Sequence, residues 1–345
     1  MKTPCVRQVD IARKIGVSQA TVSLVLNGHP TTRVSPDVRT RIETLARRMG
    51  YTPNLAARQL KGVKSRLIGV LIGSGAAPVL FERVTALERA ALGRGYRVLV
   101  GQIGRRFEQL EAYVDDLVGR GIDGVVCMSH ENRDDPTAVP KMLSRLNNVV
   151  YLRKPAILNG RYVHIDAADC IHQAVDYLMS RGRRRIATVV LDRFHQANLD
   201  RYRAYFEAMD RHGHGAGEDL VWIGGDDLGP NPHEVSNEKA DEVVECLVGK
   251  ARADSIIAIN DDWAAQLIKA IKRRGLRVPE DVGIVGQGNF KIAGFFDPEI
   301  TTLDPRNDLF ADAAIDLIVE MIDGRTGREE MPRTIKPTLI VRRSA

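Results

Sequence analysis

The chain has 345 residues, a length at which two or more compact units are expected instead of one hydrophobic core. Its charge is uneven: residues 1–66 hold 13 Lys and Arg against 3 Asp and Glu, although the whole chain has a formal net charge of only +6. This local excess predicts a polyanionic partner for the N-terminal part, because Lys and Arg displace counterions from phosphate backbones. No apolar run approaches the roughly 20 residues that span a bilayer, and the N-terminus has no signal-peptide pattern, so we expect a cytoplasmic protein without a membrane partner.

The four cysteines indicate neither a disulfide framework nor a metal site. The cysteines are Cys5, Cys127, Cys170 and Cys246. They are far apart in the sequence, and most of them lie inside apolar runs. His212 and His214 lack further metal ligands nearby in the sequence. We therefore expect free, buried thiols and predict neither a metal nor a cofactor.

The first structured segment reads as helix, tight turn, helix. Gly16 and Val17 interrupt the helical pattern of residues 8–15, and Ser18 offers a side-chain oxygen that can cap a second helix reaching Asn27. On that second helix, three- and four-residue spacing places the apolar side chains of Val22, Val25 and Leu26 on one face. Four side chains are left facing outward as candidate DNA readers: Gln19, Ala20, Ser23 and Leu24.

A third helix and a basic connector complete the N-terminal part. Ser35-Pro36-Asp37 supplies a cap, a first-turn proline and an N-terminal acid, and Gly50 is a natural end for the helix. Residues 54–62 are helix-prone but shorter than the roughly 12 to 15 residues that an isolated helix needs in water. We expect this segment to be helical only when something packs on it; an ordinary basic linker is the alternative.

From Arg66 onward, short apolar runs alternate with amphipathic stretches. The runs predict strands at Leu67–Ile72, Tyr96–Val100, Asp123–Met128, Asn148–Leu152, Arg185–Val190, Leu220–Ile223, Ser255–Ile259 and Val282–Val285. The stretches between them predict helices, including Val79–Arg94, Ile171–Arg181, Asn198–Arg211, Lys239–Gly249 and Asp262–Arg274. So many βα units predict two parallel sheets covered on both faces, with a ligand crevice at the carboxyl ends of their strands.

Several motifs, taken together, closely resemble the lactose/galactose repressor family of bacterial transcription regulators. They are Val9-Asp10-Ile11-Ala12, Gly16-Val17-Ser18, Ala20-Thr21-Val22-Ser23, Leu26-Asn27, Gly50-Tyr51-Thr52-Pro53-Asn54, Gly121-Ile122-Asp123-Gly124-Val125, Asn260-Asp261, Gly275-Leu276-Arg277-Val278-Pro279 and Thr301-Thr302-Leu303. The resemblance implies an all-α helix-turn-helix head and an α/β core of two doubly wound subdomains, similar to periplasmic sugar-binding proteins. It also implies a homodimer that binds a pseudo-palindromic operator in double-stranded DNA.

The resemblance implies three domains and three crossings between the core subdomains. The head would be residues 1–53, the hinge 54–65 and the core 66–345. We expect the crossings near residues 166–168, near 290–293 or slightly later at 304–306, and near Gly327. The first subdomain would then comprise about 66–167 and 306–326, and the second about 168–304 and 327–345.

The resemblance also assigns DNA contacts residue by residue. Base reading falls to Gln19, Ala20 and Leu24, and contact with or approach to phosphates to Ser18, Thr21, Ser23 and Asn27. Leu24 departs from the arginine of many relatives, so we expect an operator in which the matching base is not a strongly read guanine. Leu60 matches a hinge leucine that wedges into the central base step from the minor groove. The remaining expected contacts are Arg33, Tyr51, Asn54, which would also cap the hinge helix, and Ala57, which would let paired hinge helices approach.

In the same family a small molecule in the crevice controls DNA binding. The matching positions are Arg201, Asp166 and Asp261, which suit a polyhydroxylated, sugar-like effector, with surface ion pairs as the competing interpretation. Trp263 is either an aromatic wall of the crevice or a packing residue. Ala76-Ala77-Pro78-Val79 and Gly286-Gln287-Gly288-Asn289 depart from the usual pattern, so Pro78, Val79 and Gly288 stand at effector positions with altered chemistry. A purine, or no effector at all, remains open.

An enzyme is the main rival from another class. Gly73-Ser74-Gly75 is followed by Ala76-Ala77-Pro78, which places proline where a dinucleotide-binding fingerprint needs its third glycine. Ser129-His130-Glu131 is interpreted as a polar loop and not as a catalytic cluster, because the side chains of adjacent loop residues do not point toward one another. A sugar-binding module without DNA function is the second rival, but it would not need residues 1–62. We therefore predict a DNA-binding regulator that acts as a repressor and catalyses no reaction.

Overall fold

The computed structural model describes most of the chain as two compact units, Met1–Ser65 and Arg66–Ala345. The residues it describes are 6–27, 34–51, 64–73, 78–103, 107–131, 135–157, 160–215, 217–224, 233, 235–325 and 333–345.

The N-terminal unit contains three helices around one small core. They are α1 Gln8–Ile15, α2 Gln19–Leu26 and α3 Pro36–Arg48. The Ser18 and Ser35 hydroxyls accept backbone N–H groups of α2 and α3, at 3.1 and 3.4 Å, so both expected caps are present. Gly16 ends α1 with a φ of +78°, a conformation that glycine adopts without strain. The fully buried side chains at the centre come one from each helix: Ile11, Val22 and Ile42.

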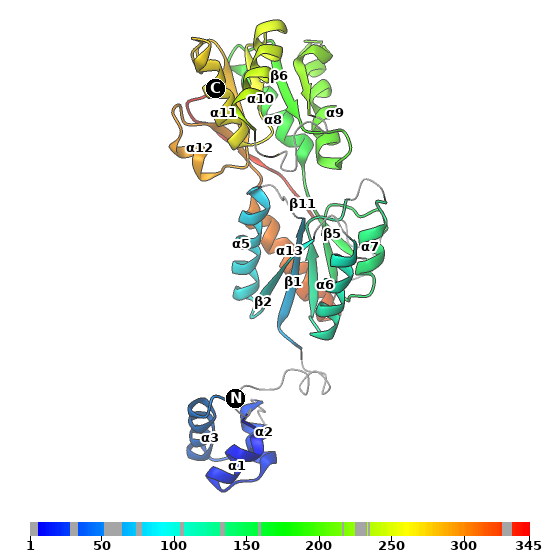
Figure 1. Ribbon diagram of the computed structural model, residues 1–345, viewed down its shortest axis with the longest axis vertical. Coiled ribbons are helices and arrows are strands. Elements are labelled where there is room, and N and C mark those ends of the chain that lie inside the picture. Colours follow the sequence, from blue (N-terminus) through cyan, green and yellow to red (C-terminus); the bar gives the residue numbers. More distant parts are fainter. Residues whose placement is uncertain are drawn as a thin grey trace. The chain divides into compact units, whose positions relative to one another are not determined.

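The second unit begins with a six-stranded, all-parallel sheet in the order β11-β5-β4-β3-β1-β2 (Figure 1). Its strands are β1 Leu67–Gly73, β2 Arg97–Ile103, β3 Gly124–Cys127, β4 Val149–Leu152, β5 Arg161–Ile165 and β11 Arg333–Ile335. Its helices are α5 Pro78–Gly93, α6 Phe107–Gly119, α7 Ala138–Leu143 and α13 Asn307–Ile322. Alternate residues of β1 enter different cores: Val70 packs with α5 and α13, whereas Leu71 packs with α6 and α7. The sheet is therefore covered on both faces, as its continuous apolar strands predict.

A second six-stranded sheet has the order β12-β10-β9-β8-β6-β7. Its strands are β6 Ile186–Val190, β7 Val221–Ile223, β8 Ser255–Ile257, β9 Gly283–Gln287, β10 Thr301–Asp304 and β12 Thr338–Ile340. Only β12 runs antiparallel to its neighbour among the pairs that the structure describes. The helices of this half are α8 Ala167–Ser180, α9 Gln196–Arg211, α10 Asn237–Val244, α11 Asp261–Arg273 and α12 Lys291–Phe295. A short 3₁₀ turn spans Glu218–Leu220, and α10 continues as a π-helix over Glu245–Lys250.

The chain passes between the two sheets three times. It leaves the first sheet after Ile165 and returns after Asp304, where α13 packs on the first sheet. The third passage lies between Ile335 and Thr338, because β11 belongs to the first sheet and β12 to the second. This corrects the expectation of a crossing near Gly327. Pairing of β11 with β5, a long-range contact, decides this position, and local sequence carries no signal for it.

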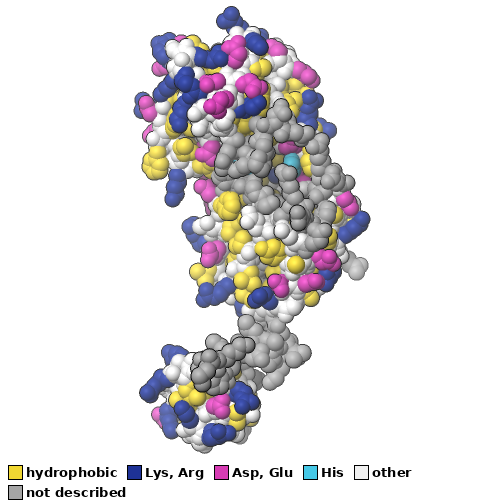
Figure 2. Space-filling view, in the orientation of Figure 1, with side chains coloured by type: hydrophobic (Ala, Val, Ile, Leu, Met, Phe, Trp, Pro, Cys, Tyr) yellow, Lys and Arg dark blue, Asp and Glu magenta, His cyan; other side chains and the backbone are white. Residues whose placement is uncertain are grey.

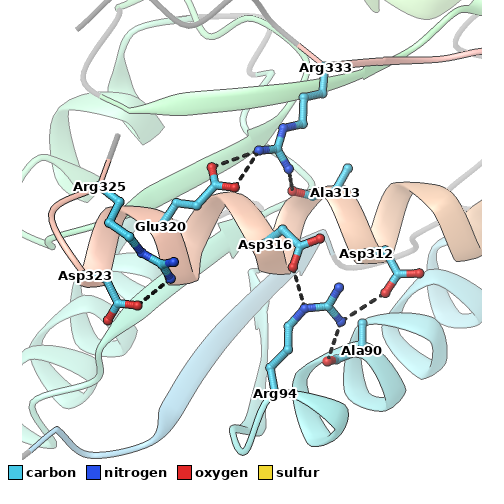
Figure 3. Close-up of polar contacts among 9 residues, drawn as sticks. All are labelled: Ala90, Arg94, Asp312, Ala313, Asp316, Glu320, Asp323, Arg325 and Arg333. Carbon is cyan, nitrogen blue, oxygen red and sulfur yellow. Dashed lines mark hydrogen bonds and ion pairs between the residues drawn. The ribbon is translucent and has the colours of Figure 1, made fainter. Parts of the chain in front are cut away.

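A polar clamp fixes α13 on the first sheet (Figure 3). Arg94, which follows α5, donates to Asp316 at 2.6 Å and to Asp312 at 3.0 Å, both on α13. From the other side, Arg333 of β11 makes two hydrogen bonds to the Glu320 carboxylate, at 2.8 and 2.9 Å. These bonds hold α13 and β11, which come late in the chain, on the first sheet.

Within the described ranges, no helix is long and apolar enough to cross a membrane.

Candidate functional site

The exposed face of α2 is the first candidate site. Val22 and Val25 are buried, and the side chains of Gln19, Ala20 and Leu24 are exposed, Leu24 to 40%. The face therefore combines polar and apolar side chains and carries no charge of its own. Charge comes from the neighbouring helix ends, since Arg13 and Lys14 lie in the last turn of α1 and are exposed. Figure 2 shows Lys and Arg side chains spread over the visible face of this unit.

Hydrogen bonds organise the polar residues at the two ends of α2. The Ser18 and Thr21 hydroxyls are 2.8 Å apart, and the Asn27 amide donates to the Ser23 hydroxyl at 3.2 Å. The Ser18 and Thr21 hydroxyls sit beside the exposed N-terminus of the helix, whose N–H groups attract phosphate. Tyr51 packs partly buried against the small core. Four further expected DNA contacts lie outside the described residues: Arg33, Asn54, Ala57 and Leu60.

In the second unit, side chains from both halves of the core contribute to one electrostatic group. Arg153 directly follows β4 of the first sheet, and Arg201 lies on α9, beside the second. Charge on Arg153 and Arg201 lowers the pKa of Arg83, on α5, although burial is the larger cause. The three guanidinium groups therefore lie close enough to repel one another, and we call them the arginine cluster. Arg83 is only 7% exposed.

Neutral amides hold two of these arginines. Arg201 donates through Nε to Gln287 Oε1 at 3.1 Å and through Nη1 to Asn198 Oδ1 at 3.2 Å. Arg83 donates through Nε to Asn307 Oδ1 at 2.8 Å. Within the part of the chain that the structure describes, no carboxylate forms an ion pair with Arg83 or Arg201. Burial is the main cause that lowers the pKa of Arg201.

A second group surrounds the loop after β6. Asp192 accepts hydrogen bonds from the backbone N–H groups of Phe194 and His195, and from the side chains of His195 and Asn198. The hydrogen bond from His195 to Asp192 raises the pKa of His195. Burial instead lowers the pKa of His233 to about 4, so this imidazole is neutral at pH 7. The loop thus holds the Asp192 carboxylate and the His195 imidazole together, next to the Asn198 amide that accepts a hydrogen bond from Arg201.

The structure gives the expected effector residues different local roles. Asp166 caps α8 by accepting the N–H of Asp169 at 3.0 Å, and it remains partly exposed. Val79 is half-buried at the start of α5; the side chain of Pro78 lies outside the described residues. Gly288 has a φ of +121°, and a Cβ there would lie 2.5 Å from the Phe290 ring. Glycine is thus required by the backbone at this position.

Asp261 and Trp263 require a correction of the crevice assignment. Asp261 is fully buried: Thr302 donates to one carboxylate oxygen at 2.5 Å, and the Phe290 N–H donates to the other at 2.7 Å. Trp263 is also 0% exposed and packs on Trp222, with ring centroids 5.5 Å apart. Asp261 therefore fastens the β9–α12 loop, and Trp263 is a core residue, the packing alternative.

Sequence reasoning missed Arg83, Arg153 and Asp192 as site residues. Arg153 and Asp192 come after β4 and β6, which the sequence predicts as strands at Asn148–Leu152 and Arg185–Val190, so the rule that ligands bind at the carboxyl ends of parallel strands could have found them. Arg83 carries no such signal, because it is one of many charged residues on an amphipathic helix. Its burial follows from the packing of α5 on α13, where its guanidinium lies over the Phe310 ring at 5.7 Å.

A helix-turn-helix unit, followed by one parallel and one mainly parallel sheet with polar side chains from both halves, defines a DNA-binding regulator whose core resembles a ligand-binding domain. Comparison with known families agrees: residues 9–54 match the model of bacterial regulatory proteins of the lacI family, and residues 175–345 match a periplasmic binding protein-like domain. The chain is similar to the lacI family in its N-terminal unit, and it is a DNA-binding transcriptional regulator.

Whole-chain relatives agree with this assignment. The HTH-type transcriptional repressor PurR of Erwinia tasmaniensis is 28% identical over 345 residues, covering 97% of this chain and 95% of the relative. CytR of Escherichia coli K12, also a transcriptional repressor, is 27% identical and covers 90% of this chain and 89% of its own.

Solved structures show the same fold. The lac repressor dimer bound to operator and the anti-inducer ONPF has a TM-score of 0.82 at 22% identity, covering 99% of both chains. The complex of the regulator CelR with cellobiose has a TM-score of 0.69 at 27% identity, covering 99% of this chain and 100% of the other.

Proposed function

We propose that the protein is a repressor that binds a pseudo-palindromic operator as a homodimer and regulates transcription without catalysing a reaction. One observation carries the DNA-binding part: α2 is capped by Ser18 and exposes Gln19, Ala20 and Leu24 while its other face is buried. A helix of this kind reads base edges in the major groove, and dimers of such heads match symmetric half-sites. The lac repressor, which binds its operator as a dimer, supports the assembly.

The proposed DNA contacts are of two kinds, with base edges and with the phosphate backbone. Base contacts fall to Gln19, Ala20 and Leu24, and phosphate contacts to Ser18, Thr21, Ser23 and Asn27. Leu24 can make only apolar contact, such as with a thymine methyl group. Arg33 and Tyr51 add backbone contacts. In the proposed hinge, residues 54–65, Asn54 caps a helix, Ala57 allows its dimer mate to approach, and Leu60 wedges into a minor-groove base step.

The core, residues 66–345, is proposed to bind a sugar-like small molecule between its two sheets. Support comes from Arg201 and Asp166, which both lie near Cys170, and from the match of residues 175–345 to a periplasmic binding protein-like domain. The structurally similar regulator CelR was solved in complex with cellobiose. Pro78, Val79 and Gly288 would border this site, and binding there would alter how the hinges and heads engage DNA. Asp261 and Trp263 support it from the core.

Selection from a random double-stranded DNA library tests the DNA-binding proposal. The expected product is a pseudo-palindrome whose half-sites change with Gln19→Ala. Affinity for the selected sequence should fall steeply with salt, because phosphate contacts release counterions. Lys14→Gln, an exposed change at the end of α1, should weaken binding to every sequence and flatten the salt dependence, whereas Gln19→Ala should relax only sequence preference. Failure to enrich any sequence, or affinity independent of salt, would refute the proposal.

An effector-independent regulator is the alternative for the core. Measuring operator affinity with and without sugars, phosphosugars and purines distinguishes the two. A ligand that binds the native core should raise its melting temperature and change operator affinity together. Operator affinity that no ligand of the panel changes would favour the effector-independent protein.

A further inference from the structure

Three arginines withdrawn from solvent come from both halves of the core, and within the described residues no carboxylate forms an ion pair with Arg83 or Arg201, while Arg153 has one long ion pair. Arg83 comes from α5 and Arg153 from the end of β4, both in the first half, whereas Arg201 comes from α9 in the second. Arg83 is buried, and the other two are partly buried. Burying a guanidinium is costly unless a carboxylate or another anion pairs with it. Arg83 and Arg201 nevertheless have only side-chain amide oxygens as hydrogen-bond acceptors in the described structure.

Arg153 is the least satisfied of the three. Its closest carboxylate contact, Nε to Glu131 Oε1, is 3.7 Å long, which is an ion pair without a good hydrogen bond. Its Nη1 atom is buried and has no hydrogen-bond partner among the residues the structure describes. Its backbone has a φ of +85°, which is unusual for a residue with a side chain and marks a position held by its surroundings. A buried donor left open in a native protein calls for a partner.

Other groups near the cluster make no direct ion pair with Arg83 or Arg201 in the described structure, although the charges of Asp192 and Asp200 act on Arg201 and raise its pKa against the larger lowering by burial. Cys170 lies close to Arg83 and Arg201, but burial raises the pKa of its thiol to about 11, so it is neutral at pH 7. Asp192 already accepts four hydrogen bonds from the loop after β6 and the start of α9. Asp166 caps α8, and Asp200 accepts from the Gln196 side chain at 2.6 Å. Besides burial, the groups that shift the pKa of Arg83 are the two other arginines and Cys170, with no carboxylate among them.

We propose that the effector carries an anionic group, a phosphate monoester or a carboxylate, which the side chains of Arg83, Arg153 and Arg201 bind together. Guanidinium groups match the geometry of phosphate and carboxylate oxygens, and charge-assisted hydrogen bonds are about twice as strong as neutral ones. Because the arginines come from both halves of the core, the anion joins the two halves and relieves their mutual repulsion. The inference rests on the proposed effector site and narrows its ligand from a sugar to an anionic sugar or a related small anion.

The test compares each anion with its neutral parent on the full-length protein. The probes are glucose 6-phosphate, ribose 5-phosphate, gluconate and inorganic phosphate, with glucose and ribose as neutral controls, all at matched ionic strength. Melting temperature and calorimetric Kd are the readouts. At least one anion should raise the melting temperature and bind at least tenfold more tightly than its neutral parent. The phosphate and gluconate arms identify which anion the site takes.

Substitutions in the arginine cluster test whether the anion binds there or on the basic N-terminal unit. Arg83→Gln and Arg201→Gln should each weaken the anion's Kd at least tenfold and leave the neutral parent's Kd unchanged. Arg83→Lys, which keeps the charge, should restore part of the affinity. The matched control is Arg203→Gln, because Arg203 lies on the same helix as Arg201 and is exposed. Anion binding equal in Arg203→Gln and Arg201→Gln would place the anion elsewhere, on the head for example, and overturn the inference.

The same experiment separates this inference from the proposed function. If a neutral sugar binds as tightly as its phosphate and changes operator affinity, the effector function stands and the anionic ligand is refuted. If an anion binds through Arg83 and Arg201 without changing operator affinity, the anion site stands and its regulatory role is refuted. If none of the anions, inorganic phosphate included, binds in a way that depends on Arg83 or Arg201, the inference falls.

Discussion

Asp261→Asn tests whether this carboxylate supports the fold or contacts the effector. The carboxylate is fully buried and accepts hydrogen bonds from Thr302 and the Phe290 N–H. Burial raises the pKa of Asp261 to about 6, above the ordinary value of about 3.9. The folded state therefore holds this proton more tightly than the unfolded state. The stability that the protonated group provides is present below about pH 4 and is lost as pH rises through about 6.

The magnitude follows from the same pKa. At about 1.4 kcal/mol per pKa unit, the ionised carboxylate costs the wild-type protein on the order of 3 kcal/mol at neutral pH. Asparagine keeps the shape and removes the charge. The free energy of unfolding of Asp261→Asn, relative to the wild type, should therefore rise by roughly 2 kcal/mol between about pH 4.5 and 7 and stay constant above.

Tryptophan fluorescence during urea unfolding measures this effect directly. Both tryptophans of the chain, Trp222 and Trp263, pack in the core of the second sheet. Asp297→Asn is the control, since the Asp297 side chain is 84% exposed; its difference from the wild type should not change over the same pH range. A difference for Asp261→Asn that does not depend on pH, or lost effector binding with unchanged stability, would refute the structural role.

Three other substitutions test the head and the β9–α12 loop. Leu24→Arg should shift library selection toward guanine at one half-site position, because arginine bonds guanine through two donors; unchanged selectivity would contradict the role of Leu24. Ile42→Ala should cost about 2–5 kcal/mol in the head and abolish operator binding in a gel shift, while the tryptophan unfolding midpoint stays the same. Gly288→Ala should destabilise the core by about 1–3 kcal/mol and lower that midpoint, because φ is +121° and the new Cβ meets the Phe290 ring; an unchanged midpoint would speak against this strain.

Local sequence was sufficient for the elements that carry their own signals. The caps Ser18 and Ser35 and the positive-φ Gly16 define where the helices of the head begin and end. The sequence predicts strands such as Leu67–Ile72 and Arg185–Val190 because a strand buried on both faces needs an unbroken apolar run. The short terminal strand β11 gave no such signal: its residues are partly exposed at a sheet edge, so the third crossing was placed near Gly327 instead of after Ile335.

Local sequence also predicted one part of the candidate sites, whereas long-range packing decided the rest. Sequence by itself determined the exposed face of α2, because helical periodicity fixes which side chains can be buried beneath it. It also determined the two-sheet core, since continuous apolar strands separated by amphipathic helices have few other ways to bury their surface. Tertiary structure alone decided that Asp261 and Trp263 belong to the core, and that Arg153 and Arg201 lie near enough to Arg83 to act on its charge, although 118 positions separate Arg83 from Arg201. Burial and charge repulsion depend on distances between segments remote in the chain, and no local pattern encodes those distances.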